Sequence, residues 1–313
     1  QNGTFSMTDQ LQKFLFQQAA VRGEFVEIGK AWSQIQSNHH YPSSVTRLLG
    51  EMVGAAALLC GNIKFNGALI LQIQGDGPVR LLVVECDSAL HIRATAKLDS
   101  EAVISDEASF TDLINAHGRG RFVITLDPHD KVPGQQPYQG IVSLEGDTIS
   151  HVIENYMKQS EQLDTRIQLA ADKDVIRGLL LQKMPSQTGA DGLSEKNEEE
   201  ENAWQHLAAL ASTLKPKEML ETDVDTLRHR LFWDEDVYMF DPLTPVFQCT
   251  CSRDKVAHML KMLGEKEVND ALAEQGDLSI DCDFCGQSYP FNKDDCARIF
   301  SPEPNDSTGN TIH

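Results

Sequence analysis

Apolar residues near the start of the chain recur every three to four positions, which is the period of an amphipathic helix. The spacing predicts a helix over 8–22, ended by Gly23. Polar and apolar residues then alternate over 24–30, which predicts a short strand. The apolar positions of the predicted helix are Leu11, Phe14, Leu15 and Ala19.

A mixed pattern of helices and strands continues to about residue 185. The segment from Ser43 or Ser44, either of which can cap a helix, to Leu59 is rich in small residues and predicts a long, closely packed helix. Two alternating segments over 68–74 and 79–85 flank a Gly-rich turn and predict a β-hairpin. Runs of strands with helices between some of them predict an α+β domain over 7–186. The other predicted elements are strands over 91–98, 121–126, 140–144, 166–170 and 178–183, and helices over 110–117 and 148–159.

The pattern changes over 187–247, which we interpret as an acidic, helical linker; its regulatory role is implied by the family resemblance described below. Between Gln187 and Phe247 there are 14 acidic and 5 basic residues, so this segment carries −9 of the net charge of −20. Apolar positions at helical spacing nevertheless predict a helix over 203–214. The stretch over 220–233 carries further apolar residues, Leu227, Leu231, Phe232 and Trp233, so the linker as a whole is expected to be helical. Short helices are marginal by propensity alone, so these need a surface to cover with their apolar faces.

A small C-terminal domain over 248–300 is predicted next. Ser252 can cap a helix over 253–263, and a second helix over 265–275 ends at Gly276. A strand from Asp277 leads to Cys282. We expect a small aromatic core from Phe284, Tyr289 and Phe291.

Four cysteines in this domain form two close pairs, Cys249-Thr-Cys251 and Cys282-Asp-Phe-Cys285. Each pair can present two thiolates from one turn, and a tetrahedral Zn²⁺ site needs four such donors. We therefore predict that Cys249, Cys251, Cys282 and Cys285 bind Zn²⁺. The first pair is C-x-C, whereas zinc ribbons more often use C-x₂-C.

Charge and composition exclude several classes of partner. Acidic residues outnumber basic ones 47 to 27, which argues against a nucleic-acid binder, because phosphate neutralisation requires a basic surface. The apolar run at 52–60 is too short to span a membrane, so no membrane partner is expected. We see no secretory leader before Thr8 and expect a cytoplasmic protein, where close cysteine pairs favour metal over disulfide. We expect 1–6, a foreign extension before a natural start at Met7, and 301–313 to be disordered tails.

No catalytic constellation stands out, so we do not expect an enzyme. The segment from Gly23 to Lys30 resembles a phosphate-binding loop, but it has five residues between its glycines instead of four and Ala31 after the lysine. The thiol cluster is the one strong chemical site. It can be a closed structural zinc site or a redox-sensitive one.

Oxidation of the cluster is chemically accessible. In an extended backbone, the Cα atoms of two residues separated by one other residue lie roughly 6.6 Å apart. This is near the outer limit of about 6.8 Å for a disulfide, so bonding Cys249 to Cys251 would bend the chain and remove two ligands together. C-x-x-C thiols pair more easily. Loss of zinc would unfold a domain with so small a core and remove support from the marginal acidic linker.

The sequence also resembles a known family over 7–300, the redox-regulated 33-kilodalton heat-shock chaperones of bacteria. The most specific motifs are Cys249-Thr-Cys251-Ser-Arg and Cys282-Asp-Phe-Cys285-Gly. The others are Leu49-Gly-Glu51, Gln72-Ile-Gln-Gly-Asp-Gly-Pro78, Tyr138-Gln-Gly-Ile-Val142, Ser160-Glu-Gln-Leu-Asp-Thr165 and His229-Arg-Leu-Phe-Trp233.

This resemblance implies an ATP-independent holdase with an α+β core, a helical linker and a small zinc-binding domain. It implies Zn²⁺ on the four cysteines in the reduced, inactive state, and disulfides within each pair after oxidation combined with heat or another unfolding stress. The linker would then unfold, and the chain would dimerise, bind unfolded client proteins and hold them for ATP-dependent foldases. Cys60, Cys86 and Cys296 fall outside the ligand pattern, although Cys296 is close enough in sequence to divert a disulfide.

Two other functions stay open at this point. A constitutive zinc-ribbon protein-interaction module would keep its zinc after peroxide and heat. A thiol oxidoreductase would turn over a disulfide substrate, but the sequence lacks a C-x-x-C at a strand-to-helix start in a βαβ unit.

Overall fold

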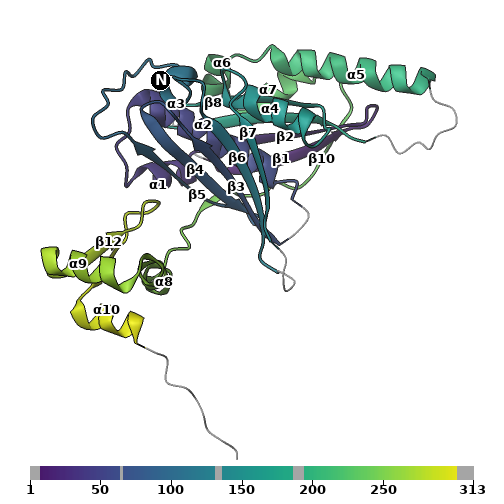
Figure 1. The fold of residues 1–313 in the computed structure, drawn as a ribbon. Coiled ribbons are helices and arrows are strands. Elements are labelled where there is room, and N and C mark those ends of the chain that lie inside the picture. Colours follow the sequence, from purple (N-terminus) through teal and green to yellow (C-terminus); the bar gives the residue numbers. More distant parts are fainter. Residues whose placement is uncertain (1–7, 64–65, 131–135, 186–193, 302–313) are drawn as a thin grey trace, which may run out of the picture. The chain divides into compact units, whose positions relative to one another are not determined.

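The computed structural model describes residues 8–63, 66–130, 136–185 and 194–301 (Figure 1). The chain divides into two compact units, Gln1–Gln248 and Cys249–His313. Both contain helices and strands, which confirms the α+β class. The predicted division into a core, a linker and a zinc domain stays a prediction. The predicted tails lie outside the described residues, apart from Ser301.

Two sheets form the first unit. The first sheet has the order β10-β1-β2-β9-β8, and all its neighbouring strands are antiparallel. Its strands are β1 (Gln10–Phe16), β2 (Val21–Ile28), β8 (Thr165–Ala171), β9 (Ile176–Lys183) and β10 (Val237–Met239). The second has the order β11-β5-β4-β3-β6-β7, with only β11 parallel to its neighbour. Its strands are β3 (Gly67–Gln74), β4 (Val79–Asp87), β5 (His91–Leu98), β6 (Arg121–Pro128), β7 (Tyr138–Ser143) and β11 (Val246–Phe247).

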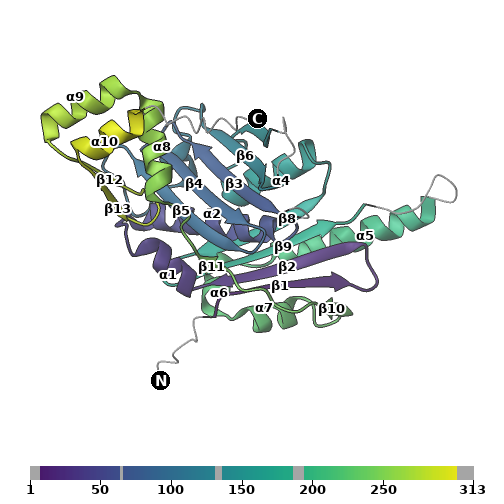
Figure 2. The same cartoon turned by 90° about the horizontal axis from the view of Figure 1, so that it is seen from below.

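Helix α2 (Ser43–Cys60) packs against strands of both sheets and forms the centre of the main core (Figure 2). Its small residues permit this close approach, because a Cβ atom added at Gly50 would lie 2.6 Å from Cβ of Ala171. Pro42, not a serine, occupies its N-cap position, so the predicted serine cap is wrong. The helix is long and apolar enough to cross a membrane, contrary to the estimate from 52–60 alone. However, 72% of it is buried inside the protein, as in a core helix.

The remaining helices of this unit begin and end as follows: α1 (Lys30–Gln36), α3 (Phe110–Ile114), α4 (Ile149–Gln159), α5 (Ser194–Ser212), α6 (Pro216–Glu221) and α7 (Val224–Leu231). The apolar stretch over 220–233 spans the end of α6 and all of α7. A new helix begins before Val224, where the Asp223 side chain accepts a hydrogen bond from the Thr226 N–H at 2.9 Å.

The first predicted helix, over 8–22, is also wrong, because these residues form β1, a turn and the start of β2. Both faces of the first sheet are covered. Leu11 is buried in the core around α2, whereas Phe14 and Phe16 pack on the opposite face with residues of α5, α6 and α7. Burial on two faces removes the alternation that identifies a half-buried strand, and the remaining spacing imitates a helix.

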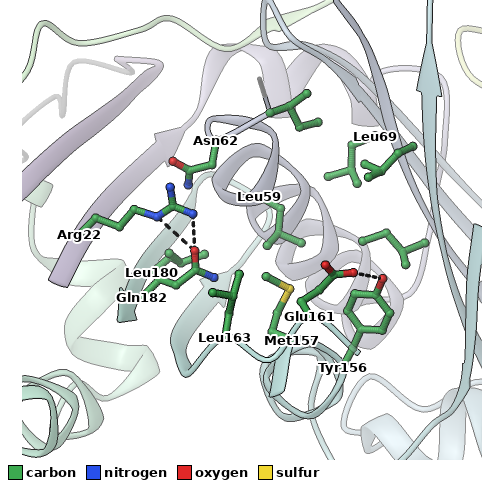
Figure 3. A pocket seen from close by; sticks show the side chains of 13 residues that line it. Arg22, Leu59, Asn62, Leu69, Tyr156, Met157, Glu161, Leu163, Leu180 and Gln182 are labelled. Carbon is green, nitrogen blue, oxygen red and sulfur yellow. Dashed lines mark hydrogen bonds between the residues drawn. The ribbon is translucent and has the colours of Figure 1, made fainter. Parts of the chain in front are cut away.

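A pocket of about 270 Å³ lies in the first unit, beside the C-terminal end of α2 (Figure 3). Its wall is mainly apolar and includes Leu59 and Met157. On one side the Arg22 guanidinium donates to the Gln182 side-chain oxygen, and on another the Tyr156 hydroxyl donates to Glu161 at 2.8 Å. The first sheet and α2 therefore leave some internal volume unfilled.

The second unit is small. It consists of α8 (Arg253–Leu263), α9 (Glu265–Gln275), β12 (Leu278–Asp281), β13 (Ser288–Phe291) and α10 (Lys293–Phe300). The predictions for α8 and α9 are confirmed residue by residue. The buried residues are Leu260, Val268, Leu272, Leu278, Phe291 and Cys296, with Tyr289 partly buried against them. Phe291 thus joins the core as predicted, whereas Phe284 is not among these residues.

Candidate metal centre

The first cysteine pair lies in the loop between β11 and α8. Cys251 directly precedes Ser252, whose side chain caps α8 by accepting a hydrogen bond from the Lys255 N–H at 3.2 Å. This confirms the predicted cap. The N-terminal end of a helix favours negative charge, so the position suits a thiolate.

The second pair lies in the turn between β12 and β13, which are antiparallel. The Cys282 N–H donates to the Gln287 carbonyl at 2.9 Å, and the Gly286 N–H donates to the Cys282 carbonyl at 2.8 Å. Gly286 has φ of 70°, a left-handed conformation that glycine adopts without a Cβ clash. This tight turn brings Cys282 and Cys285 to the same cluster.

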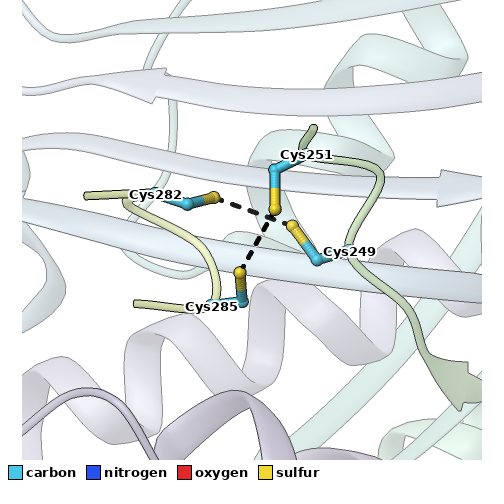
Figure 4. A group of neighbouring side chains, drawn as sticks. All are labelled: Cys249, Cys251, Cys282 and Cys285. Atoms are coloured by element: carbon cyan, nitrogen blue, oxygen red, sulfur yellow. Dashed lines mark hydrogen bonds between the residues drawn. The ribbon is translucent and has the colours of Figure 1, made fainter. Parts of the chain in front are cut away.

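All four predicted thiols converge, and their sulfur atoms lie within 4.8 Å of one another (Figure 4). The Sγ atoms of Cys249 and Cys282 are 3.7 Å apart, and those of Cys251 and Cys285 are 3.4 Å apart. Four sulfurs at Zn–S distances of about 2.3 Å in a tetrahedron lie about 3.8 Å from each other. The donor set and its spacing therefore fit a tetrahedral ion that prefers thiolates, and the cluster can hold a metal ion.

The surroundings of the thiols disfavour negative charge unless a cation compensates it. Burial first, and then the neighbouring thiols, raise the pKa of Cys285 to about 12, although the Gln287 N–H opposes this. Burial also raises the pKa of Cys282, although the N–H groups of Phe284 and Cys285 oppose this. Four thiolates at such short distances repel one another, and a bound dication reverses this balance.

Two side chains other than the cysteines support the cluster. The Tyr289 hydroxyl donates a hydrogen bond to Sγ of Cys251 at 3.0 Å. Arg253 donates to the Pro290 carbonyl at 2.6 Å and forms an ion pair with Asp295 at 2.9 Å, and it lies over the Phe291 ring. Arg253 therefore connects the helix that follows the first pair to the strand that follows the second.

The sequence predicts no contact of these two residues with the cluster, since it places Tyr289 in the aromatic core and Arg253 at the start of a helix. Two sequence features point to a role. Arg253 is the last residue of the motif Cys249-Thr-Cys251-Ser-Arg, and Tyr289 is four residues after Cys285.

The other cysteines are buried and are not members of this cluster. The Cys60 thiol donates to the Asp87 carbonyl at 3.0 Å, and burial raises the pKa of Cys86 well above its ordinary value. Cys296 lies in the core of the second unit. The disulfide pairing, and any diversion by Cys296, stay predictions.

Comparisons with known proteins agree with one another. The model of a family described as Hsp33 protein matches residues 9–292. A protein named 33 kDa chaperonin from Methylobacillus flagellatus is 44% identical over 298 residues, which are 95% of this chain and 96% of the relative. Another of that name, from Pseudomonas aeruginosa, is 42% identical over 309 residues, 98% of this chain and 100% of the relative.

A solved structure shares the fold. The crystal structure of a 33 kDa chaperonin, a heat shock protein 33 homolog from Thermotoga maritima, matches with a TM-score of 0.75 and 18% identity. The match covers 93% of this chain and 97% of that one.

Proposed function

The chain belongs to the Hsp33 family of heat-shock chaperones, and from this premise we propose that it is an ATP-independent holdase controlled by thiol oxidation. As a chaperone of this family it binds unfolded proteins. In our proposal the reduced, metal-bound form is inactive, and oxidation makes it competent to bind clients. The observation that carries the proposal is the convergence of four thiols within 4.8 Å in a unit with a small apolar core.

We propose Cys249, Cys251, Cys282 and Cys285 as the ligands of one Zn²⁺ ion. When bound, the ion supplies the positive charge that stabilises four thiolates and cross-links two loops. The polypeptide supplies the Cys282–Cys285 turn, the helix end beside Cys251 and the Arg253 connection. Structural zinc contributes roughly 10–16 kcal/mol to the folding of small domains, so the second unit should unfold without it.

Oxidation would consume the ligands in pairs. The two thiolates of one pair lose two electrons to an oxidant such as hydrogen peroxide and form one S–S bond, while the peroxide takes up two protons and leaves as two water molecules. A disulfide sulfur is a poor ligand for zinc, because the thiolate is the form that binds metal. We propose the pairings Cys249–Cys251 and Cys282–Cys285, and the release of zinc once they form.

The switch would act on the linker, whose support is limited. Helices α5, α6 and α7 contribute Trp204, Met219 and Leu227 to the apolar face of the first sheet. Between them and Cys249 the chain is held by short strands. Directly before Cys249, the Gln248 N–H donates a hydrogen bond to the Ile92 carbonyl at 3.1 Å. A disulfide between Cys249 and Cys251 would bend the chain at 249–251, directly beside this hydrogen bond.

We further propose that the active form is a cytoplasmic homodimer that transfers clients to ATP-dependent foldases and has no enzymatic activity of its own. The function is tested by comparing reduced, zinc-bound protein with oxidised, zinc-free protein in the aggregation of a heat-denatured enzyme. We expect suppression of light scattering only by the oxidised form. Oxidised, zinc-free protein that fails to suppress aggregation would falsify the proposal. Zinc that stays bound after peroxide and heat would favour an interaction module, and turnover of a disulfide substrate an oxidoreductase.

A further inference from the structure

A strap over 236–248 occupies the outer edge of the first sheet and then reaches the second. Its strand β10 pairs antiparallel with β1 at Phe14–Met239, Leu15–Tyr238 and Phe16–Val237, and Leu243 forms a further bridge with Leu11. Figure 2 shows β10 beside β1. The strap ends at β11, which pairs with β5 through two residues. In the described chain, β1 therefore has β2 on one side and the strap on the other.

Alternate residues of β1 point their backbone groups at the strap. The Leu11 N–H donates to the Leu243 carbonyl at 2.7 Å, and the Gln17 N–H donates to the Asp236 carbonyl at 2.9 Å. The Lys13 carbonyl accepts from the Phe240 N–H at 3.0 Å. By the alternation of an antiparallel ladder, the residues between them direct their N–H and C=O groups to β2. If the strap leaves, one full row of donors and acceptors on β1 loses its partners.

The strap fits this edge imperfectly. Val237 and Met239 pack against the apolar core of that face, but Tyr238 and Phe240 are 56% and 42% exposed. Pairing shifts by one residue between Met239 and Leu243, as at a β-bulge. Side chains of β10 therefore alternate between the apolar core and solvent, and much of the outer face of the strap is exposed.

A cavity of about 440 Å³ lies at this shift and is lined by Phe14, Gly23, Glu24, Phe240 and Leu243 among others. The Glu24 carboxylate is buried there near Lys13 and Asn62, and among the described residues neither of its oxygens accepts a hydrogen bond of ordinary geometry. Unfilled volume and a buried carboxylate without well-formed hydrogen bonds both weaken the attachment of the strap. The β1 edge can therefore pair with a strand, but its pairing with β10 of the strap is weak.

We propose that β1 is the client-binding edge, and that a client segment adds to it as an antiparallel strand after the strap leaves. This inference rests on the proposed holdase function. The apolar side chains at alternate positions of the client would take the places of Val237 and Met239. Unpaired edges accept extended peptides through main-chain hydrogen bonds, with alternate side chains giving selectivity.

Strand pairing at β1 would select the segments through which unfolded proteins aggregate. Aggregation-prone segments of about six or seven residues have high β-propensity and apolar side chains, and β1 is 7 residues long. The corresponding edge of β5 is less available, because the Tyr41 hydroxyl accepts from the Ala96 N–H at 3.0 Å and donates to its carbonyl at 3.1 Å. We therefore assign capture to β1 alone.

Amide hydrogen exchange of the full-length chain at single-residue resolution tests this assignment. Three samples are compared: reduced zinc-bound protein, oxidised zinc-free protein, and oxidised protein with reduced, alkylated α-lactalbumin, which stays unfolded without heat. We expect the strap-facing amides of Leu11 and Gln17 to exchange roughly tenfold or more faster after oxidation and to regain protection with the client. The β2-facing amides of Gln12 and Phe14 are controls within the same strand and should stay protected throughout.

The outcomes separate the inference from the function. If the oxidised protein suppresses aggregation but its Leu11 and Gln17 amides still exchange fast with the client bound, the inference is overturned and the holdase function stands. Protection that returns on oxidation without client, and rises with protein concentration, also overturns it, because a second copy then occupies the edge. A chain that neither binds the client nor suppresses aggregation contradicts the proposed function itself.

Discussion

Arg177 forms a buried connection between the first sheet and the linker helices, and its removal should release the linker without oxidation. Its Nε donates to Oε2 of Glu27 at 2.6 Å, and both side chains are less than a tenth exposed. Its Nη1 donates to the carbonyls of Met219 and Leu220 at 2.9 and 2.7 Å. These carbonyls belong to the last turn of α6, where intrahelical partners are missing.

The expected effect of Arg177→Met follows from these contacts. Removing one partner of a buried ion pair costs about 3–5 kcal/mol, because the other charge stays buried and unpaired. Each carbonyl that loses a charge-assisted hydrogen bond adds roughly 1–3 kcal/mol, but the terms share one side chain and do not add. We expect linker attachment to weaken by about 3–5 kcal/mol, a factor of roughly 10² to 4 × 10³ in its equilibrium.

Limited trypsin digestion of reduced, zinc-bound protein measures this release, because α6 and α7 contain Lys217, Arg228 and Arg230. Cleavage there should be roughly a hundredfold faster in Arg177→Met than in the unmodified chain. The variant should also suppress client aggregation without peroxide.

A matched control breaks an ion pair away from the linker. Arg93 and Glu85 are 2.6 Å apart on β5 and β4, so Arg93→Met should lower general stability and leave linker cleavage unchanged. The double variant Glu27→Gln/Arg177→Met should recover part of the loss, since no charge is then left buried. Equal cleavage rates in Arg177→Met and Arg93→Met would refute the reasoning.

Three further predictions concern other residues. Burial raises the pKa of Glu24 from 4.5 to about 7, so its contribution to stability is complete below pH 4.5 and is lost as pH rises to 7. The stabilisation produced by Glu24→Gln should therefore grow by about 3 kcal/mol between pH 4.5 and 8. Urea unfolding followed by tryptophan fluorescence tests this, because all three tryptophans precede Cys249, and a pH-independent difference would contradict it. Arg253→Ala should weaken zinc binding by about 10–100-fold in chelator competition. The control Arg298→Ala, which removes a more exposed ion pair with Asp295, should change it little, and equal effects would contradict the role of Arg253. The double substitution Val237→Ser/Met239→Ser should allow the reduced, zinc-bound protein to bind client, measured by light scattering, and unchanged inactivity would count against the strap as a barrier.

The cysteine cluster could be predicted because local spacing determines it. Each close pair of cysteines defines one turn, and the four thiols can bind one metal ion only if the two turns meet. Helices α8 and α9 were also predictable, since Ser252 begins the first and glycines at 264 and 276 follow the two helices. In each case the determining residues lie within a few positions of the structure that they specify.

The features that the sequence did not predict correctly, or did not predict at all, depend on residues far apart in the sequence. The residues of β1 are a strand because β2 and β10 pair with them and because both faces are covered. Strands β10 and β11 contain only three and two residues, so their own sequences carry little preference. Arg177 reaches carbonyls more than 40 positions away, which no local pattern indicates. The convergence of the four cysteines was therefore predictable, whereas the contacts of the strap and of α6 with the first sheet required the fold.

The central claim is that four thiolates hold zinc and that losing it activates the chaperone. The most direct measurement follows released zinc and client aggregation over time in one sample, after peroxide is added at an elevated temperature. We predict that one zinc ion per chain is released, and that suppression of aggregation appears with this release or after it. Suppression that appears while zinc is still bound, or complete release without suppression, would contradict the account.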